Sequence, residues 1–150
     1  INDDKLDLAK KVGAEFTVNA AKEDAAERIK EITGIGAHAA MVTAVSKAAF
    51  NSAIDCVRAG GRVVAVGLPV ETMDLSIPRT VLDGIEVVGS LVGTRQDLAE
   101  AFDFGARGIV VPVVQTRALD EVGDIFEEMH AGKIQCRMVL DMKKSCGHNH

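Results

Sequence analysis

The stretch AAMVTAVSKAAFNSAIDCVRAGGRVVAVG, residues 39–67, contains two short apolar runs on either side of an amphipathic segment. The runs AAMVTAV and RVVAVG do not alternate apolar with polar residues, which is typical of strands buried on both faces of a parallel sheet. Ser46 is the expected N-cap of the helix between them, and Gly60 marks its expected end. Apolar residues recur there at the spacing of one helical face: Ala49, Phe50, Ala53, Ile54 and Val57. The stretch therefore predicts a strand–helix–strand unit, which is typical of an α/β fold.

The same alternation continues on both sides of this unit. Four further segments have the apolar periodicity of amphipathic helices: residues 3–13, 21–34, 94–108 and 119–133. Asn2 or Asp3 is the expected N-cap of the first and Gly13 its end, and Thr94 with Asp97 predicts a capping box at the third. Four short apolar runs predict further strands: FTVN (16–19), IEVVGSLV (85–92), VVPVVQ (110–115) and CRMVLDM (136–142). The expected fold class is α/β.

A glycine motif in residues 34–39, GIGAHA, has the spacing G-x-G-x-x-A of loops that bind a dinucleotide pyrophosphate. Such a loop follows a strand and opens into a helix, whose N-terminal amides face the phosphates. Here a predicted helix precedes the motif and a predicted strand follows it, so the order is reversed. Gly34 is therefore interpreted as a helix C-cap and Gly36 as the turn into the strand. Gly60 and Gly61 are interpreted in the same way, as the end of a helix before a strand.

Composition argues against several classes of function. The chain has 150 residues, 47% of them hydrophobic, a net charge of −5, and no tyrosine or tryptophan. Scattered basic residues and the lack of these stacking rings argue against a nucleic-acid partner. No apolar run approaches the roughly 20 residues that span a bilayer, and the charged N-terminus is unlike a secretory signal, so we expect a cytoplasmic protein without membrane contact. Cys56, Cys136 and Cys146 are an odd number of cysteines at wide spacing, which favours reduced thiols.

Four stretches together carry a family resemblance: residues 12–34, 42–69, 84–104 and 132–142. The most specific part is GSLVGTRQDLAEAFDF (89–104), which follows GRVVAVGLP (61–69) at a short distance. In their order and amino-acid sequence these stretches resemble the zinc-dependent, NAD-linked alcohol dehydrogenases of the medium-chain superfamily, particularly the bacterial and yeast-like tetrameric branch. The resemblance extends from Ile1 to about Met142.

The resemblance implies a Rossmann-like parallel sheet that lacks its first two strands, plus the C-terminal return segment of the catalytic domain. Residues 1–91 are then a partial dinucleotide-binding domain, residues 92–142 the last Rossmann helix and the return, and residues 143–150 a tail. In the family's strand order 3-2-1-4-5-6, the runs at 39–45, 62–67 and 85–92 lie side by side. The run at 16–19 is left without a neighbouring strand, so we expect residues 1 to about 32 to depend on other chain segments.

Cofactor contacts follow from the same resemblance. Residues 43–45 and 66–68, at the ends of two predicted strands, are expected to contact NAD, and open α/β sheets bind ligands at such carboxyl ends irrespective of family. Ser90 to Val92 correspond to the backbone that holds the nicotinamide carboxamide, Lys5 to a ribose contact, and Arg137 to an arginine on the pyrophosphate. For Val66 and Val92, simple core packing is the alternative. The implied cofactor-binding residues are Ile1, Lys5, Ala20, Thr43, Ala44, Val45, Val66, Gly67, Leu68, Ser90, Leu91, Val92 and Arg137.

The implied function is oxidation of primary alcohols to aldehydes with NAD and zinc. In the family, the glycine-rich loop, the acid that grips the ribose and the zinc ligands all lie upstream of the residue aligned with Ile1, so we expect the 150 residues alone to be inactive. Cys56 and Cys136 align with no zinc ligand. Cys146, His148 and His150 in the tail are possible metal ligands, and a disordered extension is the alternative.

The resemblance also implies a homo-oligomer, with a small alcohol or aldehyde as substrate. In ETMDLSIPRT (71–80), a short strand at about Asp74 to Ile77 is expected to pair across a dimer axis, within a tetramer. Two other functions stay open at this point. The segment could be a non-catalytic nucleotide-binding or oligomerisation module, or it could belong to a zinc-free relative of the quinone reductases.

Overall fold

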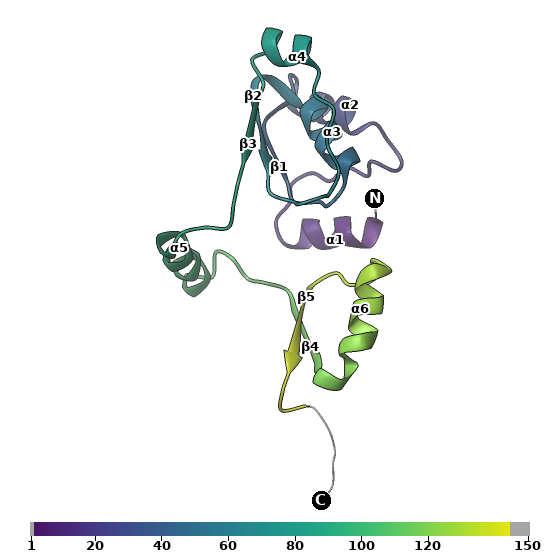
Figure 1. Ribbon diagram of the computed structural model, residues 1–150, viewed down its shortest axis with the longest axis vertical. Coiled ribbons are helices and arrows are strands. Elements are labelled where there is room, and N and C mark those ends of the chain that lie inside the picture. Colours follow the sequence, from purple (N-terminus) through teal and green to yellow (C-terminus); the bar gives the residue numbers. More distant parts are fainter. Residues whose placement is uncertain (1, 145–150) are drawn as a thin grey trace, which may run out of the picture. The chain divides into compact units, whose positions relative to one another are not determined.

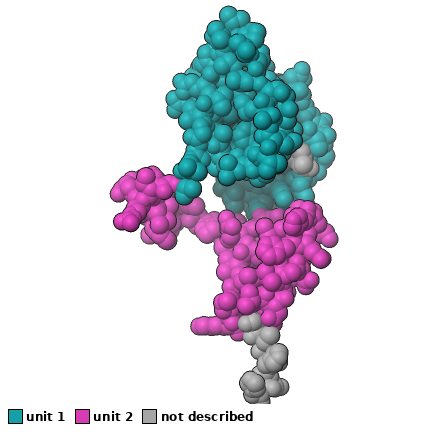
Figure 2. Space-filling model, viewed as in Figure 1, with its two compact units in different colours: residues 1–92 teal, residues 93–150 magenta. Residues whose placement is uncertain are grey.

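The computed structural model describes residues 2–144, and these residues form helices and parallel strands in alternation (Figure 1). The chain divides into two compact units, residues 1–92 and 93–150 (Figure 2). The expected α/β class is confirmed. None of the helices among the described residues is long and apolar enough to cross a membrane.

The first unit is built on a three-stranded parallel sheet. Its strands are β1 (Ala37–Val42), β2 (Val57–Ala65) and β3 (Glu86–Gly89), in the order β1-β2-β3. Val63 in the middle strand is paired with Ala40 of β1 and with Val87 of β3. The prediction that these three runs lie side by side is therefore confirmed.

Helix α3 (Lys47–Cys56) connects β1 to β2 and supplies much of the core. Apolar side chains bury themselves where the helix packs against the strands, because removing them from water is favourable. Val57 and Val63 are the most completely enclosed, with 1% and 0% of their surface exposed. Helix α2 (Ala25–Thr33) packs against α3 and β1. The core cluster consists of Val42, Phe50, Ala53, Ile54, Val57, Val63 and Ile85.

The expected end of α3 at Gly60 is wrong by four residues, because the helix ends at Cys56 and β2 already begins at Val57. The register between β1 and β2 shifts after the pair Ala37 and Val57, so that Ala39 pairs with Arg62. Gly60 and Gly61 therefore lie in a bulged part of β2 and do not terminate a helix. Gly60 has a φ of +66°, which L-residues with side chains rarely adopt.

The interpretation of the GIGAHA glycines is confirmed. Helix α2 ends at Thr33, Gly34 follows as its C-cap with a φ of +82°, and its N–H donates to the carbonyl oxygen of Lys30. Gly36 has a φ of +105°, and a Cβ there would lie 2.9 Å from the backbone nitrogen of Arg58. Because β1 follows directly, no helix N-terminus faces this motif, and it is not a pyrophosphate loop.

The N-terminal helix is confirmed as α1 (Asp3–Lys11), whose N-cap Asn2 accepts hydrogen bonds from the backbone N–H groups of Asp4 and Lys5. The predicted strand at residues 16–19 is wrong, because the segment has no strand conformation and Phe16 is 57% exposed. A strand needs a neighbour for its backbone hydrogen bonds, and no described strand pairs with this segment.

The predicted strand at Asp74 to Ile77 is also wrong. Residues 71–76 have no regular structure, and helix α4 (Ile77–Leu82) begins directly after them. The Ser76 hydroxyl oxygen accepts a hydrogen bond from the backbone N–H of Arg79, and Pro78 stands in the first helical turn. Proline is well suited to that position because the first helical residues have no intrahelical acceptor for an N–H. The sequence SIPR is therefore a helix start.

The second unit contains helix α5 (Arg95–Ala106), strand β4 (Val114–Ala118), the short 3-10 helix η1 (Leu119–Glu121), helix α6 (Val122–His130) and strand β5 (Arg137–Asp141). Strands β4 and β5 are parallel, and α6 buries Ile125. The capping box of Thr94 and Asp97 is confirmed at the start of α5. The strand expected at 110–115 begins only at Val114, after Pro112, which has no N–H to donate.

Candidate functional site

The candidate site lies where the three parallel strands of the first unit end. Residues 43–45 follow β1, residues 66–68 follow β2, and residues 90–92 follow β3. The backbone N–H groups of Val66 and Gly67 both donate to the carbonyl oxygen of Val42, at 3.0 and 2.8 Å. The N–H of Ser90 donates to the carbonyl oxygen of Ala65 at 2.9 Å. These bonds extend the sheet past its last paired residues. The structure therefore brings the predicted segments 43–45, 66–68 and 90–92 together at the carboxyl-terminal ends of the strands, here termed the sheet edge.

Gly67 makes the closest backbone approach in this edge. A Cβ at position 67 would overlap the carbonyl oxygen of Ala44 and would lie 2.9 Å from its carbonyl carbon. Because a neighbouring backbone cannot give way as a flexible side chain can, only glycine fits at this position. The backbones that leave β1 and β2 are therefore in direct contact.

The side chains at this edge are mainly apolar and exposed. Leu68 and Leu91 are 82% and 85% exposed, and Val45 is 71% exposed. Val92 is exposed as well, so the core packing considered for it is not observed. Its φ of +45° is unusual for a β-branched residue and is a strained conformation. The sheet edge thus presents apolar surface to which a flat ligand could bind.

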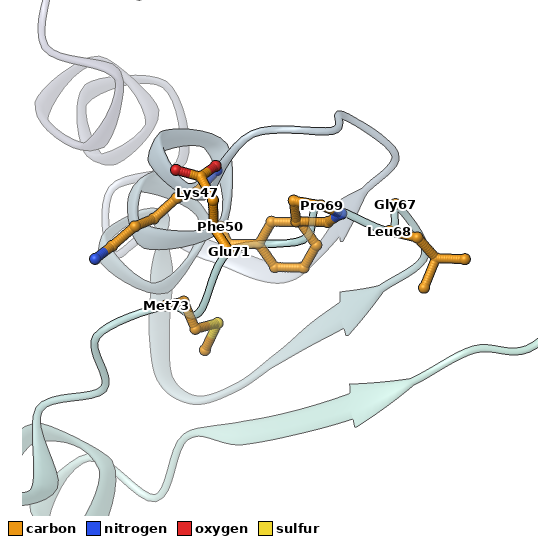
Figure 3. A pocket seen from close by; sticks show the side chains of 7 residues that line it. All are labelled: Lys47, Phe50, Gly67, Leu68, Pro69, Glu71 and Met73. Atoms are coloured by element: carbon orange, nitrogen blue, oxygen red, sulfur yellow. The ribbon is translucent and has the colours of Figure 1, made fainter.

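A hollow of about 180 Å³ lies beside this edge, between the start of α3 and the loop after β2 (Figure 3). Sequence reasoning found two of its residues, Gly67 and Leu68, and missed the rest. No spacing rule connects the start of α3 to a loop some twenty residues later, so the sequence carried no signal for them. The residues that line the hollow are Lys47, Phe50, Gly67, Leu68, Pro69, Glu71 and Met73.

The loop after β2 is fastened to the first turn of α3. Ser46 occupies the predicted N-cap position but makes no capping hydrogen bond with its side chain. The backbone N–H of Lys47 donates to a carboxylate oxygen of Glu71 at 3.2 Å, and its ammonium pairs with Asp74 at 2.8 Å. The hydrogen bond to Asp74 raises the pKa of Lys47 above its usual value. Carboxylates near a helix N-terminus are favourable, so Glu71 substitutes for the expected serine cap.

Two predicted adenosine contacts lie in the N-terminal part of the first unit. Lys5 stands in the first turns of α1 with an exposed side chain, and Ala20 is exposed in the turn after Asn19. The side chain of Asn19, which sequence reasoning missed, donates to Asp3 of α1 at 2.7 Å. The structure therefore connects the helix of Lys5 to the turn of Ala20. Ile1 lies outside the described residues.

Residues 1–107 match the family model described as zinc-binding dehydrogenase. This chain belongs to the zinc-binding dehydrogenase family. The expected family resemblance is thereby confirmed.

Solved alcohol dehydrogenases share the fold of this chain. The enzyme of the hyperthermophilic archaeon Aeropyrum pernix matches 93% of the chain with a TM-score of 0.87 and 29% identity. Benzyl alcohol dehydrogenase from Acinetobacter calcoaceticus matches 93% with a TM-score of 0.84 and 24% identity. An NAD-dependent alcohol dehydrogenase matches 94% with a TM-score of 0.83 and 23% identity. This chain spans 40%, 40% and 42% of the length of those three proteins.

The described residues of this chain offer no zinc site. Among residues 2–144, no three histidine, cysteine, aspartate or glutamate side chains are grouped closely enough to hold a metal ion. Cys56 and Cys136 are half-buried free thiols. Burial is the main cause that raises the pKa of the Cys56 thiol above its ordinary value. The tail residues considered as ligands, Cys146, His148 and His150, lie outside the described residues.

Arg137, the predicted pyrophosphate contact, is the first residue of β5 in the second unit. It is exposed, and its backbone N–H donates to the carbonyl oxygen of Val113 at 2.8 Å. Its guanidinium carries the five donors that suit a phosphate. Its role in binding the coenzyme stays a prediction.

Proposed function

We propose that these residues form the coenzyme-binding part of an NAD-linked alcohol dehydrogenase that oxidises primary alcohols to aldehydes. The observation that carries the proposal is the assembly of residues 43–45, 66–68 and 90–92 at one sheet edge, with Gly67 in contact with Ala44. Ligands of open parallel sheets bind outside the carboxyl ends of the strands, and this edge is formed by three such ends. Family membership supports a dehydrogenase.

In this proposal the strand ends hold the nicotinamide half of NAD, which accepts the hydride from the alcohol. The exposed side chains of Val45, Leu68 and Leu91 pack against the ring and exclude water from it. The backbone of Ser90 to Val92 binds the carboxamide and so fixes which way the ring faces. Gly67 lets the backbones that leave β1 and β2 approach each other, which keeps the strand ends of the site together. The residues of the chain thus bind and orient the coenzyme, and they perform no chemistry themselves.

The family resemblance assigns contacts with the other half of the coenzyme to four further residues. Lys5 contacts the adenosine ribose, Ala20 and Ile1 line the adenine cleft, and Arg137 pairs with the pyrophosphate. An exposed lysine and an exposed arginine suit these roles because both carry positive charge toward an anionic ligand.

Zinc belongs to the proposal only as an ion bound by residues outside this chain. The described residues provide no three-ligand cluster, so they do not fit a zinc ion, and we assign no step to zinc here.

A homodimer within a tetramer is part of the same proposal. Helix α4 exposes Ile77, Val81 and Leu82, which are 74%, 71% and 83% exposed. Neighbouring apolar side chains on a surface are typical of a protein interface, and this one adjoins residues 74–77, where the dimer contact was expected. The working compartment proposed is the cytoplasm, with a small alcohol or aldehyde as substrate.

A hybrid enzyme tests the proposed activity. The part of the Aeropyrum pernix alcohol dehydrogenase that matches this chain is replaced by residues 1–150, and NADH formation from primary alcohols is measured. The proposal expects alcohol-dependent reduction of NAD by the hybrid, and loss of that activity when Gly67 is replaced by alanine. A folded, zinc-containing hybrid that reduces no NAD would contradict it.

A further inference from the structure

Among residues 2–144, Asn19 is the only polar residue that is buried, with 7% of its surface exposed. It lies between α1 and α2, in a part of the chain that has no strand. A buried amide is costly unless its donors and acceptors are satisfied. The bonds that Asn19 makes therefore indicate what its burial achieves.

The side chain of Asn19 joins two segments. Its Nδ2 donates to Asp3 Oδ1 at 2.7 Å, and its Oδ1 accepts from the backbone N–H of Ala21 at 3.0 Å. Its backbone carbonyl oxygen accepts from the N–H groups of Lys22 and Glu23, at 2.8 and 3.1 Å. One residue thus shapes the turn at 19–23 and ties it to the first turn of α1.

Helix α1 has little else to hold it at this turn. The helix contains no fully buried residue, and its apolar residues Leu6, Leu8 and Ala9 are only half-buried, so apolar packing holds it weakly. Lys22 also pairs with Asp3, at 2.6 Å, but both of these side chains are more than 60% exposed. Exposed ion pairs contribute little because solvent screens them, whereas a hydrogen bond from a buried amide is costly to lose. Of these two contacts to Asp3, the bond from Asn19 is therefore the one with a buried partner.

The two connected segments carry both described residues of the proposed adenosine end. Lys5 follows Asp3 by two positions within α1, and Ala20 directly follows Asn19. A bond between Asn19 and Asp3 consequently fixes how far the lysine lies from the adenine cleft.

We infer that Asn19 is a positioning residue for the adenosine half of the coenzyme, which it serves by holding α1 against the turn at 19–23. This inference rests on the proposed function, since Lys5 and Ala20 have their adenosine role only there. Asn19 itself touches no ligand. Its loss misplaces Lys5 and leaves the strand ends that face the nicotinamide half unchanged.

The test uses the isotopically labelled 150-residue chain and two halves of the coenzyme, AMP and nicotinamide mononucleotide, titrated separately by NMR. Asn19→Ala and Asp3→Ala each remove one partner of the bond, and Asp3→Asn keeps an acceptor oxygen for Asn19. Asn51→Ala is the matched control, because the side-chain oxygen of Asn51 has no hydrogen-bond partner among the described residues.

We expect Asn19→Ala and Asp3→Ala each to weaken AMP binding by about threefold to tenfold, the effect of one lost hydrogen bond. Binding of nicotinamide mononucleotide should not be weakened. The loss in the double variant should be clearly smaller than the sum of the two single losses, because both substitutions remove the bond between Asn19 and Asp3, while the exposed pair of Lys22 and Asp3 contributes little. Asp3→Asn and Asn51→Ala should bind AMP as the unchanged chain does. Asp3→Ala changes an exposed residue, so it keeps the test valid if Asn19→Ala fails to fold.

If Asn19→Ala and Asp3→Ala weaken the binding of AMP and of nicotinamide mononucleotide equally, or weaken neither, the role of Asn19 is overturned and the proposed function stands. An unchanged chain that binds the mononucleotide and not AMP overturns the adenosine assignment together with this inference. Binding of neither half counts against the proposed function itself.

Discussion

Gly67 lies so close to Ala44 that no side chain fits between the backbones leaving β1 and β2. Replacing Gly67 by alanine forces the two strand ends apart or strains the turn. We expect a loss of about 1–3 kcal/mol in the free energy of unfolding, the usual cost of overpacking. Urea denaturation followed by circular dichroism measures it.

Gly89 provides the matched control for that substitution. It ends β3, and a Cβ built there meets no atom within 4 Å. Gly89→Ala should therefore leave the stability nearly unchanged. If both alanine variants are equally stable, the contact between Gly67 and Ala44 does not constrain the sheet edge.

Backbone protection should differ sharply between two segments of the isolated chain. Residues 63–65 lie in the central strand and pair with strands on both sides, whereas residues 16–18 have no strand partner among the described residues. We expect slow hydrogen exchange at Val63 to Ala65 and fast exchange at Phe16 to Val18. Strong and equal protection of both segments in a monomer would show that residues 16–18 have a partner that the structure does not contain.

The thiol of Cys56 should react slowly while the protein is folded. Burial raises its pKa, so less thiolate is present at a given pH than in an unfolded chain. Alkylation near neutral pH, followed by mass spectrometry of the peptide that contains Cys56, should proceed much faster in urea than in buffer. The same rate in both conditions would contradict the burial of this thiol.

The capping box of α5 should make its stability depend on pH. Asp97 accepts hydrogen bonds from the backbone N–H of Thr94 at 2.5 Å and from its hydroxyl at 2.8 Å. These bonds, the backbone one first, lower the pKa of Asp97 below its ordinary value of 3.8. Because the pKa is lower in the folded state, the stabilisation is present above 3.8 and is lost as the pH falls through the lowered value.

Asp97→Asn should remove this pH dependence, since an amide does not titrate in that range. Thr94→Ala should raise the pKa of Asp97 part of the way back, because the backbone donor remains. NMR titration of the Asp97 carboxyl carbon measures both effects. An ordinary pKa for Asp97 in the unchanged chain would show that the capping box does not form.

The sequence was sufficient to predict the parts of the fold that local pattern determines. The strands around Val42, Val63 and Val87 follow from apolar runs, and α5 begins directly after its N-cap Thr94, as the capping box requires. The end of α3 was misplaced because Val57 suits a buried helix face and a buried strand equally well. Its buried position at the start of β2 depends on the neighbouring strand, which a local pattern does not contain.

The candidate site was predictable to a similar degree. Residues 43–45 and 66–68 follow from the rule that ligands bind at strand ends, and the family resemblance selects the same residues. Residues 90–92 were predicted from the resemblance alone. Glu71 and Asn19 were missed because their partners, Lys47 and Asp3, are far away in the sequence. Side-chain bonds of this kind depend on tertiary structure, which no spacing in the sequence reveals.

The proposed coenzyme site is tested most directly by titrating the labelled chain with NADH and following every backbone amide by NMR. We expect the amide signals of Val45, Gly67 and Ser90, which follow three different strands, to shift together along one saturable binding curve. Ala59 and Gly84, at the opposite end of the sheet, should not shift. No saturable shift at the three strand ends, or a set of shifts centred on Ala59 and Gly84, would contradict the account.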